Sequence, residues 1–331
     1  MTPEEYQLWN RLEGIFMPHA RAKRDAFYHN SNKENLIRPA RFVHYTSADA
    51  ALNIIKTKRV WMRNTTCMSD YREVQHGFEL LNKFFSDEAK KKEFSTALDA
   101  CSPSSASEAI ELFNQWWSDT QFNTYIASVS EHDEKEDLYG RLSMWRAFGA
   151  NATRVAIVIG VPWLSAGALA LNLSLNPVAY LTENEVHEEI KTVVQNIREN
   201  CDFLASVDRS NIVGSVFNML VAGVTCLKHE GFHEEREWRV LYAPNRDASP
   251  LMEHSTEIIG RVPQIVYKVP LDVNVSENLA DMDMVRIFDR LIIGPSPYPW
   301  VMYQAFVAAL SEIGVPKANE RVFVSDIPIR A

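Results

Sequence analysis

Two short polar segments, far apart along the chain, carry residue types that could do chemistry. The first is His44-Tyr45-Thr46, which supplies an imidazole and two hydroxyl groups. The apolar residues before it are typical of a strand, and Ser47 after it is a residue type that caps helices. The segment therefore falls at the carboxyl end of a predicted strand, where proteins commonly hold ligands. A half-buried structural histidine would give the same pattern.

The second segment is Glu235-Arg236-Glu237-Trp238-Arg239. Residues two apart in a strand share a face, so Glu235, Glu237 and Arg239 would point the same way. Two crowded carboxylates repel each other when both are ionised, which suits general acid and base chemistry or the polarisation of a sugar hydroxyl. Arg239 would hold one of them ionised. A ladder of charges on the surface is the alternative interpretation.

Trp145 is a third candidate, because its ring could stack on a planar ligand. It lies in a helix-like segment ahead of the apolar stretch 155–159. Tryptophan is found more often in a core than in a ligand platform, so packing is the competing interpretation.

The segment His229-Glu230-Gly231-Phe232-His233 matches H-E-x-x-H, the zinc-protease signature in which two histidines one helical turn apart bind metal. An apolar helical pattern over residues 212–224 leads into it and favours that interpretation. Gly231 argues against it, because glycine inside a helix costs about 1 kcal/mol relative to alanine and more often ends a helix. Zinc hydrolysis therefore stays an alternative function, and no metal is predicted.

Hydrophobic periodicity predicts the elements that position these segments. Strands are expected at residues 41–45, 60–62, 124–129, 154–159, 237–242, 264–268, 290–293 and 321–324. Helices are expected at 3–18, over most of 71–117, and at 138–148, 183–205, 210–227 and 300–313. Because the strands are dispersed and their connections irregular, the predicted fold class is α+β. We expect an N-terminal helix and linker over 1–38 and one α+β domain over 39–331, with a helical insertion at about 71–122.

The composition is that of a folded globular protein, with 46% hydrophobic and 23% charged residues. A net charge of -9 opposes long-range attraction to a nucleic-acid backbone. The first residues carry no signal-peptide pattern, and the longest apolar stretch, 155–173, is interrupted by glycine and proline. Four scattered cysteines without a CxxC pair suit a reducing compartment. We therefore expect a soluble cytoplasmic protein with no membrane partner.

Taken in order, these segments resemble the bacterial domain-of-unknown-function 2971 family (DUF2971). The resemblance covers roughly residues 41–315 and rests on the order and spacing of short motifs. The motifs are His44-Tyr45-Thr46-Ser47, Ile54-Ile55, Val60-Trp61-Met62 leading to Asn64 and Asp70, Ser128-Val129-Ser130-Glu131, Met144-Trp145, Lys228 to Phe232, Glu235 to Arg239, and Leu291 to Pro295. The chain departs from the family at Ser69-Asp70-Tyr71, where the family often has Asn-Asp-Pro.

The opening motif is also similar to that of ADP-ribosyltransferases of the His-Tyr-Glu kind. This resemblance implies a split, mostly antiparallel sheet with helical insertions, and NAD as the substrate. Carried over by residue, His44 would bind the ribose on the nicotinamide side and Thr46 would hold the carboxamide. Tyr45 would lie beside them, and Trp145 would take the aromatic stacking position.

The same resemblance makes Glu237 the catalytic carboxylate and gives Glu235 the task of positioning or deprotonating the acceptor. Arg239 joins the cofactor site. The predicted function is an enzyme that uses NAD to modify an unknown protein or nucleic-acid acceptor, or that hydrolyses NAD, in the role of a toxin or phage-defence effector. A module that binds a nucleotide without turnover is a further alternative. The sequence carries no signal for the acceptor's identity or for an oligomeric state.

Overall fold

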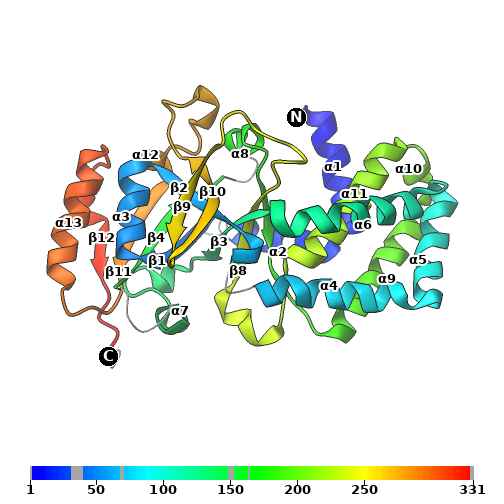
Figure 1. Ribbon diagram of the computed structural model, residues 1–331, viewed down its shortest axis with the longest axis horizontal. Helices are drawn as coiled ribbons and strands as arrows, with labels where there is room; N and C mark the ends of the chain where they lie inside the picture. The colour runs from blue at the N-terminus through cyan, green and yellow to red at the C-terminus, as the bar shows by residue number, and fades with distance from the viewer. Residues whose placement is uncertain (1, 31–39, 68–70, 148–152, 163–164, 329–331) are drawn as a thin grey trace. The chain divides into compact units, whose positions relative to one another are not determined.

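The computed structural model describes residues 2–30, 40–67, 71–147, 153–162 and 165–328 (Figure 1). The chain divides into two compact units, each built from three separate stretches. The first, which we call the helical unit, holds Met1–Ala26, Thr65–Asn123 and Asn176–His233. The second, the sheet unit, holds Phe27–Asn64, Thr124–Leu175 and Glu234–Ala331. The predicted insertion at about 71–122 falls inside the helical unit, which also takes in residues from the N-terminus and from 176–233.

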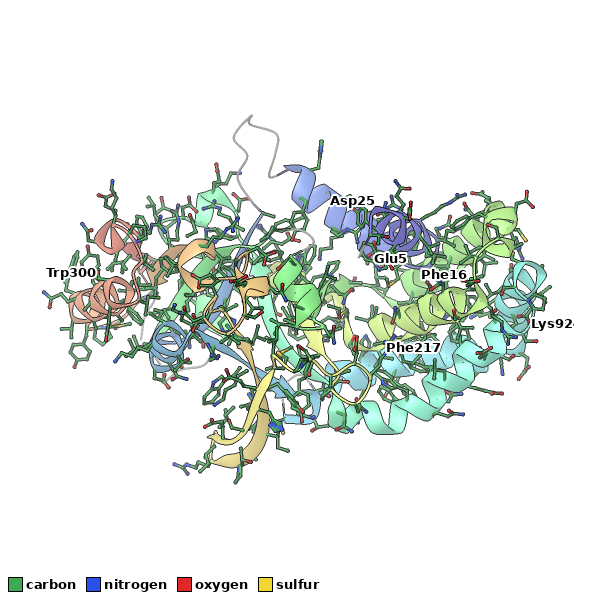
Figure 2. The ribbon with its side chains drawn as sticks, turned by 90° about the horizontal axis from the view of Figure 1, so that it is seen from above. Glu5, Phe16, Asp25, Lys92, Phe217 and Trp300 are labelled. Atoms are coloured by element: carbon green, nitrogen blue, oxygen red, sulfur yellow. The ribbon has the colours of Figure 1, made fainter. Side chains whose placement is uncertain are left out.

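The helical unit buries the apolar faces of its helices in one core. It contains α1 (Pro3–Phe16), the first part of α2 (Pro18–Asn30), η1 (Thr65–Cys67), α4 (Tyr71–Ser86), α5 (Glu88–Cys101), α6 (Ser105–Asn123), β6 (Ala179–Tyr180), α9 (Glu183–Glu199), α10 (Cys201–Ala205), α11 (Arg209–Thr225) and β7 (Leu227–Lys228). Phe16 and Phe217 lie among these helices in Figure 2, both buried in the core, whereas Lys92 is exposed. Within the described ranges, no helix of either unit combines the length and apolar character that crossing a membrane needs.

The sheet unit is organised around one sheet, which counts ten strands over the described residues. They are β1 (Arg41–Ser47), β2 (Arg59–Asn64), β3 (Tyr125–Glu131), β4 (Arg154–Gly160), β5 (Ser174–Pro177), β8 (Glu237–Tyr242), β9 (Glu253–Ile259), β10 (Val262–Pro270), β11 (Phe288–Ile293) and β12 (Val322–Val324). The main path runs β12-β11-β4-β1-β3-β2-β10-β9, and β8 pairs with β3 and β5. Along the main path every pair is antiparallel except β11 with β12. The prediction of a mixed fold with a mostly antiparallel sheet and many helices is confirmed.

The sheet forks at β3, which has β8 along one edge and two different strands along the other. Its first residues, Tyr125 and Ile126, pair with β2. Its last residues, Ser130 and Glu131, pair with β1. Residues 127–129 of β3 therefore run past the point where β1 and β2 separate.

Each face of this sheet has its own layer of helices and loops. One face packs against α3 (Ala48–Thr57), α8 (Ala166–Ala170), η4 (Glu277–Leu279), α12 (Met284–Ile287) and α13 (Pro299–Glu312), and we call it the cavity face. The opposite face carries Val43, Tyr45 and Val158 under α7 (Leu142–Ala147), and we call it the Glu237 face. Since strand residues alternate between faces, the pairing registers assign every side chain of β1, β3, β4 and β8 to one face or the other.

The predicted elements differ from the structure in three informative places. The helix expected over 183–205 is broken at Asn200 into α9 and α10. The strand expected at 264–268 is the second half of a hairpin, because β9 pairs along most of β10. The helix-like segment 138–148 narrows to α7, which begins at Leu142; residue 148 lies outside the described residues.

Candidate functional site

A cluster of serine, glutamate and arginine side chains lies where β3 pairs with β8. The register sets Ser130 opposite Glu237 and Ser128 opposite Arg239. Residues directly opposite share a face, as do residues two apart, so all four side chains lie on the Glu237 face. The expectation that Glu237 and Arg239 share a face is confirmed.

Glu237 is held by two donors inside this cluster. Ser128 Oγ donates to Glu237 Oε1 at 2.6 Å, and Arg239 Nε donates to the same oxygen at 2.9 Å. Arg239 Nη2 reaches Glu237 Oε2 at 3.3 Å. Glu237 is 4% exposed and Arg239 1%, so both charges are removed from water and depend on partners within the protein.

Glu235 does not lie on the strand, and the prediction that it shares a face with Glu237 is wrong. It ends the 3-10 helix η3 (Glu230–Glu235), and β8 begins only at Glu237. The residue between them, Arg236, has a φ of 44°, a left-handed conformation that breaks the alternation of a strand. Non-glycine residues rarely adopt this conformation, and those that do are often found at functional sites. The backbone therefore turns just before the buried carboxylate.

Arg141, which no sequence motif indicates, holds this turn in place. Its Nη1 donates to the carbonyls of Glu234 and Glu235 at 3.0 and 2.9 Å, and its Nη2 donates to the Glu131 carbonyl. Its Nε donates to Glu136 Oε1 at 2.8 Å. A single arginine thus ties the loop after β3 to the residues before β8. No sequence pattern marks Arg141, because two of its carbonyl partners, those of Glu234 and Glu235, lie 93 and 94 residues away along the chain.

Tyr45 and Trp145 meet on the Glu237 face as core residues. Their rings form a T-shaped pair with centroids 5.0 Å apart. The indole Nε1 of Trp145 donates to the Tyr139 carbonyl at 2.7 Å, and the side chain is 2% exposed. Tyr45 Oη accepts from the backbone N–H of Arg141 at 2.8 Å, and burial is the main cause that raises the pKa of Tyr45 to about 12. The structure packs Trp145 instead of presenting its ring, which corrects the expectation of a stacking platform.

His44 points to the other face of the sheet. It is opposite Ile157 on β4 and shares the cavity face with Val129 and Ile157. Its Nδ1 lies 2.9 Å from the Ser128 carbonyl, within the stretch of β3 that passes the fork. The imidazole therefore hydrogen-bonds the β3 backbone where β1 and β2 separate. Burial lowers the pKa of His44, and the bond to Ser128 offsets this only in part.

The structure does not bring His44 and Glu237 together, although both contact Ser128. His44 bonds the Ser128 carbonyl from the cavity face, and Glu237 bonds the Ser128 hydroxyl on the opposite face. Thr46 shares the face of His44 and lies opposite Val155. The predicted residues thus divide into three groups: His44 with Thr46, Tyr45 with Trp145, and Glu237 with Arg239. Ser128, which links the first and third groups, was noted in the sequence only as part of a motif.

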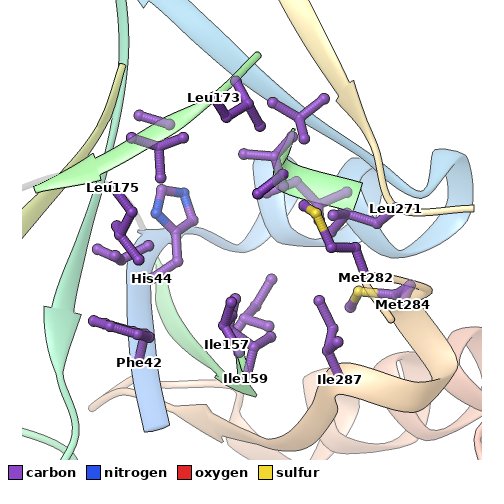
Figure 3. Close-up of a pocket in the computed structure, with 18 residues that line it drawn as sticks. Phe42, His44, Ile157, Ile159, Leu173, Leu175, Leu271, Met282, Met284 and Ile287 are labelled. Atoms are coloured by element: carbon purple, nitrogen blue, oxygen red, sulfur yellow. The ribbon is translucent and has the colours of Figure 1, made fainter. Parts of the chain in front are cut away.

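A cavity of about 120 Å³ opens beside His44 (Figure 3). The 18 side chains that line it come from the strands β1, β2, β3, β4, β5, β8 and β10, from the helices α3, α8 and α12, and from residues that flank them. Within the described chain, His44 is the one polar side chain among them.

The H-E-x-x-H segment does not form the α-helical turn that a zinc site of this kind needs. Residues 230–235 form a 3-10 helix, which repeats every three residues instead of bringing positions four apart onto one face. His229 and His233 are exposed. The Gly231 N–H donates to His229 Nδ1, and His233 Nδ1 lies 3.1 Å from the Glu230 carbonyl. Over the residues that are described, no cluster of three histidine, cysteine or acidic side chains is arranged to hold a metal ion.

Residues 144–240 match the family model of a protein of unknown function, DUF2971. This supports the resemblance to that family over part of the range on which it was predicted. The matched stretch contains Trp145, Glu237 and Arg239, while His44 and Ser128 lie before it. Comparisons with curated proteins and with solved structures give no match.

Proposed function

We propose that this chain cleaves the bond between nicotinamide and ribose in NAD and transfers the ADP-ribosyl group, with Glu237 as the catalytic carboxylate. The observation that carries the proposal is a carboxylate 4% exposed, fixed by Ser128 and Arg239 at the first residue of β8. A carboxylate held away from water interacts more strongly with a developing positive charge than a solvated one does. The motif resemblance assigns the same role to the same residue.

The proposed reaction begins when the bond from the ribose C1′ to the nicotinamide nitrogen breaks. Nicotinamide leaves as a neutral molecule with the electron pair of that bond. Positive charge then builds on C1′ and its ring oxygen, and Glu237 stabilises this charge more in the transition state than in the ground state. A nucleophilic atom of the acceptor, or water in hydrolysis, forms the new bond to C1′ and gives its proton to Glu235 or to solvent.

Substrate binding requires an exchange of partners at Glu237, because both of its oxygens accept hydrogen bonds within the strand pair. A ribose hydroxyl would take the place of the Ser128 hydroxyl, while Arg239 keeps the counter-charge. This exchange leaves the number of donors at the carboxylate unchanged, so its cost is small compared with leaving a buried acceptor unpaired.

His44 and Trp145 do not enter this proposal in the roles that the motif resemblance implied. His44 points to the cavity face, and Trp145 is enclosed in the core. The residues proposed for the reaction are therefore Glu237 and Arg239 on one face of the sheet, with Glu235 at the preceding turn. Ser128 holds Glu237 only until the substrate takes its place.

The test is to incubate the purified chain with NAD and to measure the release of nicotinamide by chromatography. Glu237→Gln keeps the shape of the side chain and removes its charge, so turnover should fall on the order of 10²-fold or more. Glu257→Gln is the matched control, because Glu257 accepts from the Ser255 hydroxyl and from Lys268, both at 2.8 Å, in the β9–β10 hairpin. Turnover that survives in Glu237→Gln contradicts the proposal. Saturable NAD binding without turnover favours a nucleotide-binding module instead.

The acceptor and the biological role need experiments of their own. Bacterial extract incubated with the protein and NAD should contain a protein or nucleic acid that gains the mass of one ADP-ribosyl group. In the role of a toxin or phage-defence effector, expression of the chain should arrest growth, and Glu237→Gln should relieve the arrest. Nicotinamide release without a labelled macromolecule would instead indicate NAD hydrolysis.

A further inference from the structure

The tautomer of His44 follows from its single hydrogen-bond partner. A carbonyl oxygen only accepts, so Nδ1 must carry the proton that is donated to Ser128 O. Desolvation lowers the pKa of His44 and so favours the neutral imidazole, in which Nε2 carries a lone pair and no proton. Among the described residues, nothing donates a hydrogen bond to Nε2. Nε2 can therefore accept a hydrogen bond from a molecule that occupies the space beside it.

That space is the cavity, and among the described side chains that line it no other is polar. Figure 3 shows the imidazole pointing inward among Leu173, Leu175, Ile157 and Met282. A buried water needs two to four polar partners, and this cavity supplies one from the described side chains. A water molecule is thus a poor match for His44, and an apolar molecule that fills the cavity would lack a partner for Nε2.

We propose that the cavity binds a small apolar molecule that carries one hydrogen-bond donor, and that His44 Nε2 accepts from that donor. Its volume of about 120 Å³ limits the occupant to about the size of a benzene ring, since dry cavities of about 150 Å³ hold benzene. The class is therefore a small alcohol or phenol. This site lies on the opposite face from Glu237 and does not rest on the proposed reaction.

Two probe molecules separate the contribution of apolar contacts to binding from that of the hydrogen bond. Phenol and toluene have nearly the same shape, and only phenol can donate to His44. Both should bind the wild-type chain in calorimetric titration. In His44→Phe the phenol hydroxyl would be buried without a partner, so the preference for phenol over toluene should fall by about tenfold or more relative to wild type.

Two variants of α8 give a matched control for the cavity itself. Ala168 lines the cavity, whereas Ala166, on the same helix, is exposed and lies outside it. Ala168→Leu should abolish binding of both probes, and Ala166→Leu should leave both unchanged. Retained binding in Ala168→Leu, or an unchanged phenol preference in His44→Phe, would place the ligands elsewhere and overturn the proposal.

A measurement on the wild-type chain covers the case in which His44→Phe does not fold. The imidazole ¹⁵N resonances of His44 should report a protonated Nδ1 and an unprotonated Nε2. Phenol should shift the Nε2 resonance, and toluene should leave it nearly in place. Equal shifts with both probes, or none with phenol at saturation, would rule out the hydrogen bond. Glu237→Gln should bind phenol like wild type, so failure of the NAD proposal leaves this result unaffected.

Discussion

The interior of the sheet at β3 and β8 and the hairpin of β9 and β10 contain the same kind of cluster. In each, a glutamate accepts from a serine hydroxyl and from a cationic side chain: Glu237 from Ser128 and Arg239, and Glu257 from Ser255 and Lys268. The side chains of the first ion pair are 6% and 2% exposed, and those of the second are 29% and 21% exposed. The two regions therefore differ in solvent access more than in composition.

This difference decides what each cluster contributes. In the hairpin, water screens the charges and can replace either partner, so the ion pair adds little to stability. In the sheet interior, no water compensates for a lost partner, and the same residue types become indispensable to one another. A carboxylate in the second setting is also the one suited to stabilise a developing charge on a substrate.

Removing the cation should give the largest difference in stability loss between the two regions. Arg239→Ala removes the cation that compensates the buried Glu237 charge and should lower the free energy of unfolding by about 3–5 kcal/mol. Lys268→Ala should cost about 0–1 kcal/mol because its pair is partly solvated. Urea denaturation of both variants measures the difference. Similar losses in the two variants would mean that burial does not distinguish the clusters.

Removing the serine hydroxyl should have a smaller effect of the same kind. Ser128→Ala takes one donor from a buried carboxylate and should cost about 1.5–3 kcal/mol, the usual range for a hydrogen bond to a charged group. Ser255→Ala should cost about 0.5 kcal/mol or less, since water can replace the donor at the exposed site. Because the substrate is proposed to displace this hydroxyl, Ser128→Ala should keep its nicotinamide release. Loss of release in a folded Ser128→Ala protein would contradict the exchange of partners.

His44 should make the stability of the folded chain depend on pH. Desolvation lowers its pKa in the folded chain, so below about pH 6.5 the unfolded chain binds more protons than the folded one. Stability should therefore fall as the pH drops through this window, by at most about 1.4 kcal/mol per pH unit for one histidine. Unfolding measured at several pH values should show a weaker dependence in His44→Gln.

A second histidine contributes to the pH dependence that this experiment measures. His132 is buried, and desolvation also lowers its pKa, so it contributes a dependence of the same sign that remains in His44→Gln. If His44→Gln has the same pH dependence as wild type, desolvation does not control the protonation of His44.

Local patterns in the sequence were sufficient for the elements and for pairs of residues within one strand. The apolar run before His44 predicted β1, and the two-residue spacing of Glu237 and Arg239 predicted their common face. The helical pattern at 300–313 likewise corresponds to α13. These signals are local because alternation and helical periodicity depend only on neighbouring residues.

The arrangement of the site depended on information that is not local. The opposite orientations of His44 and Glu237 follow from the register of β1 on β3 and of β3 on β8, which pairs residues 87 to 117 positions apart. Glu235 leaves the strand because Arg236 adopts a left-handed φ, and arginine gives no sequence signal for that conformation. The pattern predicted β10 but not its hairpin partner β9, because β9 has no buried residue and so lacks the apolar alternation that indicates a strand.

Glu237, unlike Glu257, is proposed to act on NAD. Nicotinamide release from NAD, measured in parallel for wild type, Glu237→Gln and Glu257→Gln at equal folded concentration, distinguishes the two carboxylates. We expect release by wild type and Glu257→Gln at rates within about twofold of each other, and release by Glu237→Gln at a rate on the order of 10²-fold lower or slower still. No release by the wild-type chain, or equal release by wild type and Glu237→Gln, would show that Glu237 does not catalyse this reaction.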